Sequence, residues 1–372
     1  MRIIHIVENL NKGAVENWLV NVFIESRKTK PGWEWTFYCM LGNSGRLDEQ
    51  VRQAGGNIIY APCTVSSKIR FLQALRKTLK VGKYDIIHCH HDYLSGFYLL
   101  ATYRINFKKR ILHIHNNDAA LPVGNKLLHN VLLKPFRWLG IHFSDVIVGI
   151  SNDTLQQFVK GAKLEKKQTT ILYYGIDLKK FEKITDRTLL RQQLNLPIDS
   201  IVLLFSGRMN RFKNPVFVVD ILNELLKYDK NYHSLFVGEG YLTKDVINKA
   251  AAFGISENVH IVGWRNDLAD VMKSSDTFVF PRVEYPKEGL GLVVVEAQAA
   301  ALPLFLSNGI VADAVEIPEL VHFIQLNNNP SVWAQAIQKS NKKISAIEAL
   351  ERMKMSRFSL PIATQNLLNL YA

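Results

Sequence analysis

The segment Pro281-Arg-Val-Glu-Tyr-Pro-Lys-Glu-Gly-Leu-Gly-Leu-Val-Val-Val-Glu296 indicates the fold most directly. The run before it, Thr277–Phe280, predicts a buried strand, and the apolar residues at its end predict a helix over Leu292–Ala300. A strand, a loop with glycines and a helix in this order are typical of an α/β unit. Glu288 lies in the loop, and Glu296 lies eight residues later, inside the helix.

The same segment has the chemistry of a ligand site. Gly289 and Gly291 allow the backbone to approach a ligand closely. The start of the following helix offers unpaired N–H groups and a positive dipole end, both of which suit a phosphate. Because carboxylates accept hydrogen bonds from hydroxyl groups, Glu288 could hold a hexose and Glu296 a ribose. The alternative is an ordinary helix start with one favourable acid and one surface glutamate.

Short β-rich runs alternate with helical patterns along both halves of the chain, which predicts parallel sheets covered on both faces. In the first half we expect strands over Arg2–Glu8, Trp35–Leu41, Asn57–Ala61, Asp85–His90, Arg110–His115, Asp145–Ile150 and Thr170–Tyr173. In the second half we expect strands over Ile201–Phe205, Ser234–Val237, Val259–Val262, Thr277–Phe280 and Leu304–Leu306. The sequence therefore predicts an α/β fold of two Rossmann-like, doubly wound parallel-sheet domains that face each other across a cleft.

The domain boundary is predicted from a polar segment. Lys179–Ile198 is rich in charged residues, and we expect it to be a linker. Residues Ser359–Tyr371 predict a final helix. We therefore place one domain at residues 1–180, joined by residues 357–372, and a second domain at residues 181–356.

The composition is that of a globular protein, with 48% apolar and 21% charged residues over 372 residues. The cysteines Cys39, Cys63 and Cys89 form no C-x-x-C pair and favour reduced thiols in a reducing compartment. We expect no secretory signal, because Glu8 interrupts the first apolar run, and no stretch reaches the ~20 apolar residues of a membrane span. A cytoplasmic protein is therefore expected.

The net charge of +13 comes from the first half of the sequence. Residues 1–185 contain 27 Lys or Arg against 14 Asp or Glu, whereas residues 186–372 contain 19 of each. A basic half suggests an anionic partner such as phosphate, an anionic lipid surface or nucleic acid. A well-solvated surface is the alternative.

A second candidate site is Phe205-Ser-Gly-Arg-Met-Asn-Arg-Phe-Lys-Asn-Pro215. Arg208, Arg211 and Lys213 follow a predicted strand, and Asn214-Pro215 signals a helix start. Cations fixed beside a helix start suit a diphosphate, since Arg can chelate two oxygens and Lys acts as a compact charge. The alternative is a basic surface turn.

Three turns with glycine could also approach a ligand. Gly13 lies between a predicted strand and helix, but G-x-G-x-x-G is missing, so dinucleotide binding is not expected. Val237-Gly-Glu-Gly240 and Val262-Gly-Trp-Arg265 end strands of the second half, where a nucleotide base could lie. Ordinary turns between strand and helix are the alternative.

Histidines close two predicted strands of the first half, with His88, His90 and His91 at one and His113 and His115 at the other. His113 and His115 share a face of their strand. Metal binding is one interpretation, although no Cys or carboxylate spacing completes a zinc or iron pattern. We favour the other interpretation, in which one histidine at a strand end hydrogen-bonds a substrate in the cleft and the others pack or cap the core.

Taken in order, these motifs resemble those of the retaining glycosyltransferases of family four, which have the GT-B fold, over nearly the whole chain. The resemblance is carried by Gly13-Ala-Val-Glu16, His115, Tyr174-Gly-Ile-Asp177, Gly207-Arg208, Lys213, Gly238-Glu-Gly240, Gly263-Trp264, and Glu288 with Glu296 followed by Ala297-Gln-Ala-Ala. Bacterial enzymes of capsule and exopolysaccharide assembly are the most similar in these motifs. The resemblance implies transfer of a hexosyl residue from a nucleotide-diphosphate sugar, such as a UDP-sugar, to a saccharide or lipid-linked acceptor with retention of configuration.

The resemblance also implies a role for each residue. Arg208 and Lys213 would hold the donor diphosphate and stabilise the leaving nucleotide. Glu288 would hold the hexose hydroxyls, Glu296 the ribose, and His115 would lie near the donor sugar and the reacting carbon. The rest of the donor site would be Gly13, Ala14, Gly238, Trp264, Arg265, Gly289, Leu290, Gly291 and Leu292. No metal and no cofactor would be needed, because Arg and Lys supply the charge, and no side-chain nucleophile is expected.

The sequence departs from the family pattern at four positions. Ala14 replaces a second glycine in the first loop, Tyr174 replaces the asparagine before Gly-Ile-Asp, and Ala301 replaces a glycine. Ala14 adds a methyl group where the backbone would meet the ligand. Arg282 replaces a small residue after Pro281 and adds a cation that could touch sugar or phosphate.

The resemblance implies that residues 1–180 bind the acceptor and residues 181–356 the nucleotide sugar. The basic segments Lys68–Lys83, Arg104–Arg110 and Lys126–Trp138 could dock on anionic lipid, at about 1 kcal/mol per basic residue. We therefore expect a peripheral protein on the inner membrane face, with a saccharide or lipid-diphosphate-linked acceptor and no nucleic-acid partner. For Lys126–Trp138, a core helix with a solvated face is the alternative.

Two other functions remain as alternatives. A nucleotide-sugar epimerase on the same fold would change the donor sugar without an acceptor, but it is not expected to carry the ordered set of Arg208, Lys213, Glu288 and Glu296. A non-catalytic, glycosyltransferase-like partner protein is the other, and the same four residues argue against it. Nucleic-acid binding has no recognisable module in the sequence.

Overall fold

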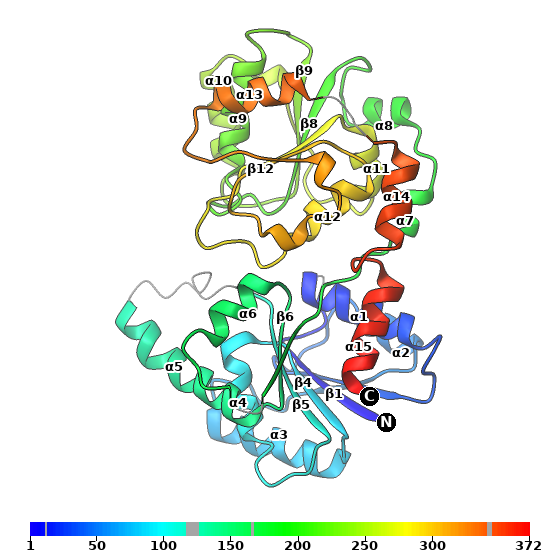
Figure 1. The fold of residues 1–372 in the computed structure, drawn as a ribbon, viewed down its shortest axis with the longest axis vertical. Helices are drawn as coiled ribbons and strands as arrows, with labels where there is room; N and C mark the ends of the chain where they lie inside the picture. Colours follow the sequence, from blue (N-terminus) through cyan, green and yellow to red (C-terminus); the bar gives the residue numbers. More distant parts are fainter. Residues whose placement is uncertain (12, 117–125, 165–166, 341–343) are drawn as a thin grey trace. The chain divides into compact units, whose positions relative to one another are not determined.

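The computed structural model describes the chain except residue 12, residues 117–125, 165–166 and 341–343, and the side chains of residues 126–132 (Figure 1). It divides into two compact units. Unit 1 comprises Met1–Ile176 and Leu360–Ala372, and unit 2 comprises Asp177–Ser359. The boundary between the units thus falls at residue 176, where 180 was predicted. Part of the predicted basic segment Lys126–Trp138 lies outside the described side chains.

Unit 1 is built on a seven-stranded sheet in the order β3-β2-β1-β4-β5-β6-β7, with every pair of strands parallel. The strands are β1 (Arg2–Val7), β2 (Glu34–Cys39), β3 (Asn57–Tyr60), β4 (Ile86–Cys89), β5 (Lys109–Ile114), β6 (Val146–Gly149) and β7 (Gln168–Ile171). The strand order reverses at β1, which makes the sheet doubly wound. The predicted strands of this half are confirmed, with ends that differ by one or two residues.

Helices cover both faces of this sheet. They are α1 (Ala14–Ser26), α2 (Asp48–Gln53), α3 (Lys68–Gly82), α4 (Ser95–Leu100), α5 (Lys126–Phe143), α6 (Asn152–Val159) and α15 (Leu360–Tyr371). Helix α15 comes last in the sequence, yet it packs beside α1 in unit 1, and Lys109 donates a hydrogen bond from Nζ to the carbonyl oxygen of Leu370 at 2.9 Å. Both chain ends therefore belong to unit 1 (Figure 1).

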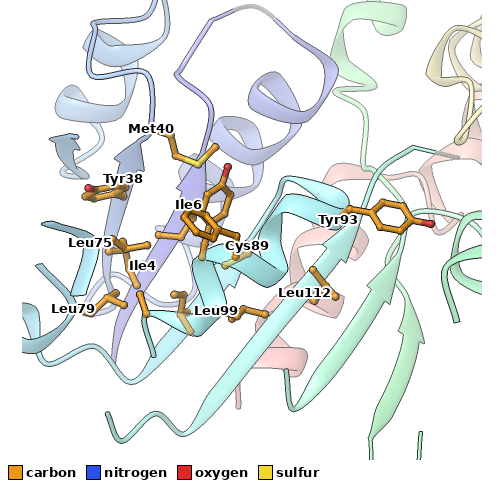
Figure 2. Packing of buried hydrophobic residues seen from close by; sticks show 14 of the residues in the cluster. Ile4, Ile6, Tyr38, Met40, Leu75, Leu79, Cys89, Tyr93, Leu99 and Leu112 are labelled. Carbon is orange, nitrogen blue, oxygen red and sulfur yellow. The ribbon is translucent and has the colours of Figure 1, made fainter. Parts of the chain in front are cut away.

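The two faces of the unit 1 sheet differ in chemistry. Because side chains alternate along a strand, Ile4 and Ile6 of β1 point into an aliphatic and aromatic core, together with Leu75 and Leu79 of α3 (Figure 2). His5 lies between these two isoleucines and points to the opposite face, where α1 and α15 pack. This opposite face holds the buried histidines.

Unit 2 has a six-stranded parallel sheet in the order β10-β9-β8-β11-β12-β13. The strands are β8 (Ile201–Ser206), β9 (Tyr232–Val237), β10 (Val259–Ile261), β11 (Thr277–Phe280), β12 (Leu304–Leu306) and β13 (Val321–Phe323). The helices are α7 (Lys179–Glu182), α8 (Arg187–Gln193), α9 (Pro215–Leu225), α10 (Thr243–Ala252), α11 (Leu268–Ser274), α12 (Leu292–Ala299), α13 (Pro330–Lys339) and α14 (Ala346–Lys354). The two-sheet α/β prediction is confirmed.

The predicted linker is wrong. Lys179–Ile198 contains helices α7 and α8, and Asp186 caps the second of these, since its side chain accepts a hydrogen bond from the Leu189 amide. Arg191 is almost fully buried and pairs with Asp276 at 2.6 Å. Arg191 is thus the one charged residue of this segment that is buried, and its other charged side chains are exposed. Strand β13 was also not predicted from the sequence.

Among the described helices, none is both long enough and apolar enough to cross a membrane.

Candidate functional site

The loop that carries Glu288 is fixed against the turn after β12. The Glu288 amide donates a hydrogen bond to the carbonyl oxygen of Gly309 at 2.8 Å. Gly309 has no room for a side chain, because a Cβ atom there would lie 2.2 Å from the carbonyl oxygen of Val283. Strand β11, which enters this loop, pairs with β8 and β12. The loop therefore sits at the carboxyl edge of the sheet, where parallel sheets bind ligands.

Two cations hold the Glu288 carboxylate by one oxygen. Lys213 Nζ lies 2.5 Å from Oε2, and the Nε atom of Arg282 donates to the same oxygen. Although burial alone would raise the pKa of Glu288, the charges of Lys213 and Arg282 lower it to about 2. No described residue hydrogen-bonds Oε1. Glu288 is thus an ionised, fixed carboxylate with one oxygen available as an acceptor.

Arg282 does not offer its charge to a ligand, contrary to the expectation from the sequence. Its side chain is buried, with the residue only 5% exposed. Its Nη1 donates to the carbonyl oxygens of Val283, at 2.9 Å, and of Pro286. Arg282 therefore clamps the loop and holds Glu288.

Glu296 lies on α12 without a partner. Within the described part of the chain, no hydrogen bond or ion pair involves its carboxylate, and burial raises its pKa to about 7, opposed only weakly by Lys180. A half-buried acid is costly unless something binds it. Its two free acceptor oxygens are therefore suited to paired hydroxyl groups.

The start of α12 lies between the two glutamates. The amides of Gly289, Leu290 and Gly291 donate no hydrogen bond among the described residues. Gly291 caps the helix with φ of 87°, a conformation that favours glycine. Free amides at a helix start provide a binding place for an anion.

The turn after β8 supplies cations at the same edge of the sheet. Arg208 is exposed, and its guanidinium makes no ion pair within the described residues. Arg211 is exposed and packs over the Phe212 ring at 4.7 Å. Lys213 belongs to the Glu288 cluster, and Pro215 starts α9, as the sequence predicted. The structure thus brings Lys213 and Glu288 into contact and leaves Arg208 open.

The turns after β9 and β10, which carry Gly238, Trp264 and Arg265, differ in how accessible these residues are to a ligand. A Cβ atom at Gly238 would lie 2.2 Å from the carbonyl oxygen of Gly207, so this glycine is required by backbone packing. Trp264 is 66% exposed beyond the end of β10, with its indole open to stacking. Arg265 is committed to Asp267, with a shortest distance of 2.5 Å. Of these three candidates, Trp264 is the most accessible to a ligand.

The candidates of unit 1 follow strands β1 and β5. Gly13 caps the start of α1, and a Cβ atom there would lie 2.1 Å from a carboxylate oxygen of Glu16. Ala14 is exposed. Gly13 and Ala14 belong to unit 1, whereas Glu288 belongs to unit 2.

His115 is buried, with 4% exposure, and both of its ring nitrogens are engaged. Its Nδ1 is hydrogen-bonded to the Tyr174 hydroxyl, and its Nε2 lies 3.2 Å from His90 Nδ1. The expected imidazole nitrogen free for a substrate is therefore not seen at this residue. His113 and His115 do share a face, with ring centroids 4.1 Å apart.

Sequence reasoning missed two members of this cluster. His5 could have been found from the alternation of side chains along β1, since it lies in register with His88 of β4. Tyr371 contacts His88 across 283 residues, and no local pattern could have indicated that contact.

Comparison with known proteins identifies the family. The family models "Glycosyltransferase Family 4" and "Glycosyl transferases group 1" match residues 29–180 and 186–354. The capsular polysaccharide biosynthesis glycosyltransferase CapH of Staphylococcus aureus is 24% identical over 378 residues, covering 100% of this chain and 98% of that protein. The UDP-Gal:alpha-D-GlcNAc-diphosphoundecaprenol alpha-1,3-galactosyltransferase of Escherichia coli is 26% identical and covers 70% of this chain and 67% of its own.

The fold also matches a solved structure. Anabaena Alr3699/HepE in complex with UDP has a TM-score of 0.80 at 17% identity, covering 100% of this chain and 99% of that one. The family models span both units, and the parallel sheets agree with the fold of these enzymes. The chain therefore belongs to the family-four glycosyltransferases with the GT-B fold, and it resembles the enzymes of capsule and exopolysaccharide synthesis.

Proposed function

We propose that this enzyme transfers a hexosyl residue from a UDP-sugar to a saccharide or lipid-linked acceptor, with retention of anomeric configuration, in cell-surface polysaccharide synthesis. The observation that carries the proposal is the pair of carboxylates around the start of α12. Glu288 is ionised with Oε1 free, and Glu296 has no partner among the described residues. Acceptor oxygens without partners suit the hydroxyl groups of a hexose and of a ribose.

The diphosphate would bind between the turn after β8 and the start of α12. Arg208 is accessible to a phosphate, and Lys213 can donate hydrogen bonds to one through its remaining N–H groups. Further donors are the amides of Gly289, Leu290 and Gly291, which make no hydrogen bond within the described chain. These fixed donors would stabilise the charge that develops on the leaving diphosphate. The chemistry proposed here therefore uses no metal ion and no cofactor.

Retention would follow from attack on the same face as the leaving group. The bond between the anomeric carbon and the phosphate oxygen breaks, and its electron pair leaves with UDP. The acceptor oxygen bonds to the anomeric carbon, and its proton passes to the departing phosphate. No protein nucleophile takes part, so the role of the protein is to position the reactants and stabilise charge.

Two relatives support the choice of substrates. The Escherichia coli relative is named for a UDP-Gal donor and a diphosphoundecaprenol acceptor. The structurally similar Anabaena protein was solved with UDP and also with UDP-glucose. We therefore propose a UDP-sugar donor and include a lipid-diphosphate-linked acceptor among the candidates.

Unit 1 carries the basic surface proposed to face the membrane. A pocket of about 630 Å³ is lined by Lys80 and Lys83 from the end of α3 and by Arg104 and Lys108 from the segment before β5. Two of the basic segments in the sequence thus lie side by side. Val81, between Lys80 and Lys83 in the sequence, is an apolar side chain that is 74% exposed. We propose peripheral binding to an anionic, cytoplasmic membrane face through this surface.

Flotation with vesicles tests the membrane proposal. The wild-type protein should float with anionic vesicles at low salt and much less at high salt, because screening weakens the attraction. The double variant Lys80→Glu/Lys83→Glu should lose this binding, whereas the exposed unit 2 pair Lys230→Glu/Lys244→Glu should keep it. Equal flotation of both double variants would contradict membrane binding through this surface.

A donor screen with product analysis tests the enzymatic proposal. UDP-sugars are incubated with and without saccharide and lipid-diphosphate acceptors, in the presence and absence of a chelator. We expect a glycosylated product only with acceptor, an α-linked product from an α-linked donor, and no loss of rate with the chelator. Conversion of the donor sugar without acceptor would indicate an epimerase, and neither binding nor turnover of any donor would indicate a non-catalytic protein.

A further inference from the structure

Seven buried polar rings in unit 1 remain without a role in the proposed reaction. His5 lies on β1, and the other histidines lie on or just after β4 and β5. The full set is His5, His88, His90, His113, His115, Tyr174 and Tyr371, and each is buried. Tyr174 follows β7, and Tyr371 is contributed by α15.

The first three links join Tyr174 to His5. The Tyr174 hydroxyl is bonded to His115 Nδ1. His115 Nε2 lies 3.2 Å from His90 Nδ1, and His90 Nε2 lies 3.0 Å from His5 Nδ1. In every link, the histidine nitrogen on the side of Tyr174 is Nδ1, and the nitrogen on the far side is Nε2.

The next three links continue in the same sense. His5 Nε2 lies 3.5 Å from the Tyr371 hydroxyl, which is the longest separation in the chain. The Tyr371 hydroxyl lies 2.7 Å from His88 Nδ1, and His88 Nε2 lies 3.2 Å from His113 Nδ1. The chain ends at His113 Nε2, a buried atom with no hydrogen-bond partner.

Each imidazole in this chain is neutral. Burial lowers the pKa of all five histidines from the ordinary value, and that of His90 falls to about 3. A neutral imidazole has one N–H donor and one acceptor nitrogen. One proton must therefore lie in each of the six links, and the direction of donation must be the same on the two sides of each histidine.

Three proton orders satisfy all six links, since the Tyr371 oxygen can also accept from both His5 and His88, which leaves its own hydroxyl proton and His113 Nε2 unmatched. If Tyr174 donates to His115 and the direction is kept throughout, every histidine carries its proton on Nε2, and the only unmatched group is the N–H of His113. If the order is reversed, every histidine carries its proton on Nδ1, and two groups are unmatched, namely His113 Nε2 and the hydroxyl proton of Tyr174. Tyr174 has no other hydrogen-bond partner in the described chain and is buried. The order in which Tyr174 donates and the direction is kept throughout leaves the fewest buried groups unpaired, so it is favoured.

We propose that Tyr174 sets a single proton order through this chain, with all five histidines as Nε2–H tautomers, and that Tyr174 is thereby a positioning residue for His115. Tyr174 occupies a position where the family pattern has asparagine, and its ring is held by stacking on Trp18, with centroids 4.6 Å apart. In this order His115 Nδ1 is an acceptor and Nε2–H is given to His90. His115 is then a fixed neutral ring that neither supplies nor takes a proton during the reaction, a consequence that rests on the proposed function.

A metal ion is the competing occupant of this cluster. The nitrogens of His5, His88 and His90 lie within 4.8 Å of one another, and so do those of His90, His113 and His115. A metal would have to replace the protons of the links, since each ligand nitrogen must present a lone pair. The links already pair every nitrogen of these rings except His113 Nε2, so the hydrogen-bonded chain accounts for the cluster without a metal.

Nitrogen NMR of histidine-labelled full-length protein tests the proton order, because protonated and unprotonated ring nitrogens have separate shifts. We expect five rings with the Nε2–H pattern at pH 7 and no change in them down to pH 5. Nδ1–H rings among the five, a charged ring at pH 7, or loss of these signals with one equivalent of Zn²⁺ would overturn the proposal.

The Tyr174→Phe variant gives a second test. Without the hydroxyl, the two orders that keep one direction throughout leave two groups unmatched each, so we expect the shifts of His115 and its neighbours to move toward values averaged between the two tautomers. The matched control is Tyr98→Phe, which removes a buried hydroxyl that lies 3.2 Å from His91 Nδ1, outside the chain. The control should leave the five rings unchanged, and an unchanged spectrum for Tyr174→Phe would contradict the role of Tyr174.

The wild-type spectrum alone decides the proton order, even where Tyr174→Phe folds poorly. It is also independent of the proposed function, because it needs no substrate. If no UDP-sugar is turned over but the five Nε2–H rings are present, the proposed function fails and the proton order stands. In an active enzyme, we expect the pH profile of kcat to be the same in wild type, Tyr98→Phe and Tyr174→Phe, because none of the five rings takes a proton during the reaction.

Discussion

The polar clusters of the two units differ in how completely they are paired. In unit 1, the chain of five histidines and two tyrosines engages all ring nitrogens but one. In unit 2, Glu288 keeps a free oxygen and Glu296 has no partner within the described residues. Buried polar groups are normally paired, so unpaired ones mark places that a ligand completes. The difference supports the proposal that the unpaired carboxylates of unit 2 bind a ligand, whereas the paired rings of unit 1 fix structure.

The largest effect is expected at the Lys213–Glu288 contact. Lys213→Met or Glu288→Gln should reduce transfer by about 100-fold or more, because each removes a charge or acceptor placed against the reacting groups. Initial rates with the best UDP-sugar measure this. Lys249→Met, which breaks a 2.6 Å contact with Asp220 in the same unit, is the matched control and should keep near-normal turnover.

In unit 1, the corresponding change should alter stability and not catalysis. Tyr371→Phe removes the hydroxyl that joins His88 to His5, and it should lower the free energy of unfolding by about 1–3 kcal/mol, since two buried nitrogens lose their partner. Urea denaturation measures the change. A variant as stable as wild type would show that the histidine chain does not hold α15 in place.

Removal of Arg282 tests how far this arginine keeps Glu288 ionised. Arg282→Met leaves Lys213 as the only cation on the carboxylate, so the pKa of Glu288 should rise from about 2. Because the ionised form is needed, activity should be lost at a higher pH than in wild type as pH falls, with a rate reduced by roughly 10-fold at pH 7. The pH profile of kcat measures this effect.

The control for Arg282 is another buried arginine of unit 2. Arg191→Met removes a guanidinium that pairs with Asp276 and backbone carbonyls, so it should lower stability without moving the acid limb. Equal pH profiles for Arg282→Met and Arg191→Met would show that Arg282 does not lower the pKa of Glu288.

The smallest effect is expected from Glu296 in the absence of ligand. Its pKa rises on folding from the ordinary 4.5 to about 7, so its favourable contribution to stability is complete below pH 4.5 and is lost as pH rises through 7. Glu296→Gln should therefore be neutral at pH 4 and stabilise the protein by about 1 kcal/mol at pH 8, less than the roughly 3 kcal/mol upper limit from the pKa gap. Thermal unfolding at the two pH values measures this.

The sequence predicted those features that depend on local patterns. Thr277–Phe280 and the start of a helix at Leu292 follow from apolar runs bounded by glycines, and they place Glu288 and Glu296 correctly on a loop and a helix. The segment Lys179–Ile198 was misjudged because Arg191 finds its partner Asp276 far along the chain. The other charged residues there are exposed, so a helical segment of unit 2 has the composition of a linker.

Long-range contacts also explain what the sequence could not show of the site. Arg282 was expected to meet a ligand, but the fold turns it toward Glu288 and two loop carbonyls. Tyr174 appeared only as a departure from a motif, and its bond to His115 requires the ends of β5 and β7 to be placed in space. Sequence patterns thus indicated which residues could bind a ligand, and the fold determines which of these side chains remain without a hydrogen-bond partner.

Calorimetric titration with UDP tests whether the unpaired Glu296 carboxylate belongs to the donor site. We expect UDP to bind the wild-type protein without added metal. Glu296→Ala should weaken the affinity for UDP by about 10-fold or more through loss of the ribose contacts, and Tyr371→Phe should leave this affinity unchanged. UDP affinity that is the same in wild type and Glu296→Ala would contradict the assignment of the unpaired carboxylates of unit 2 to the donor site.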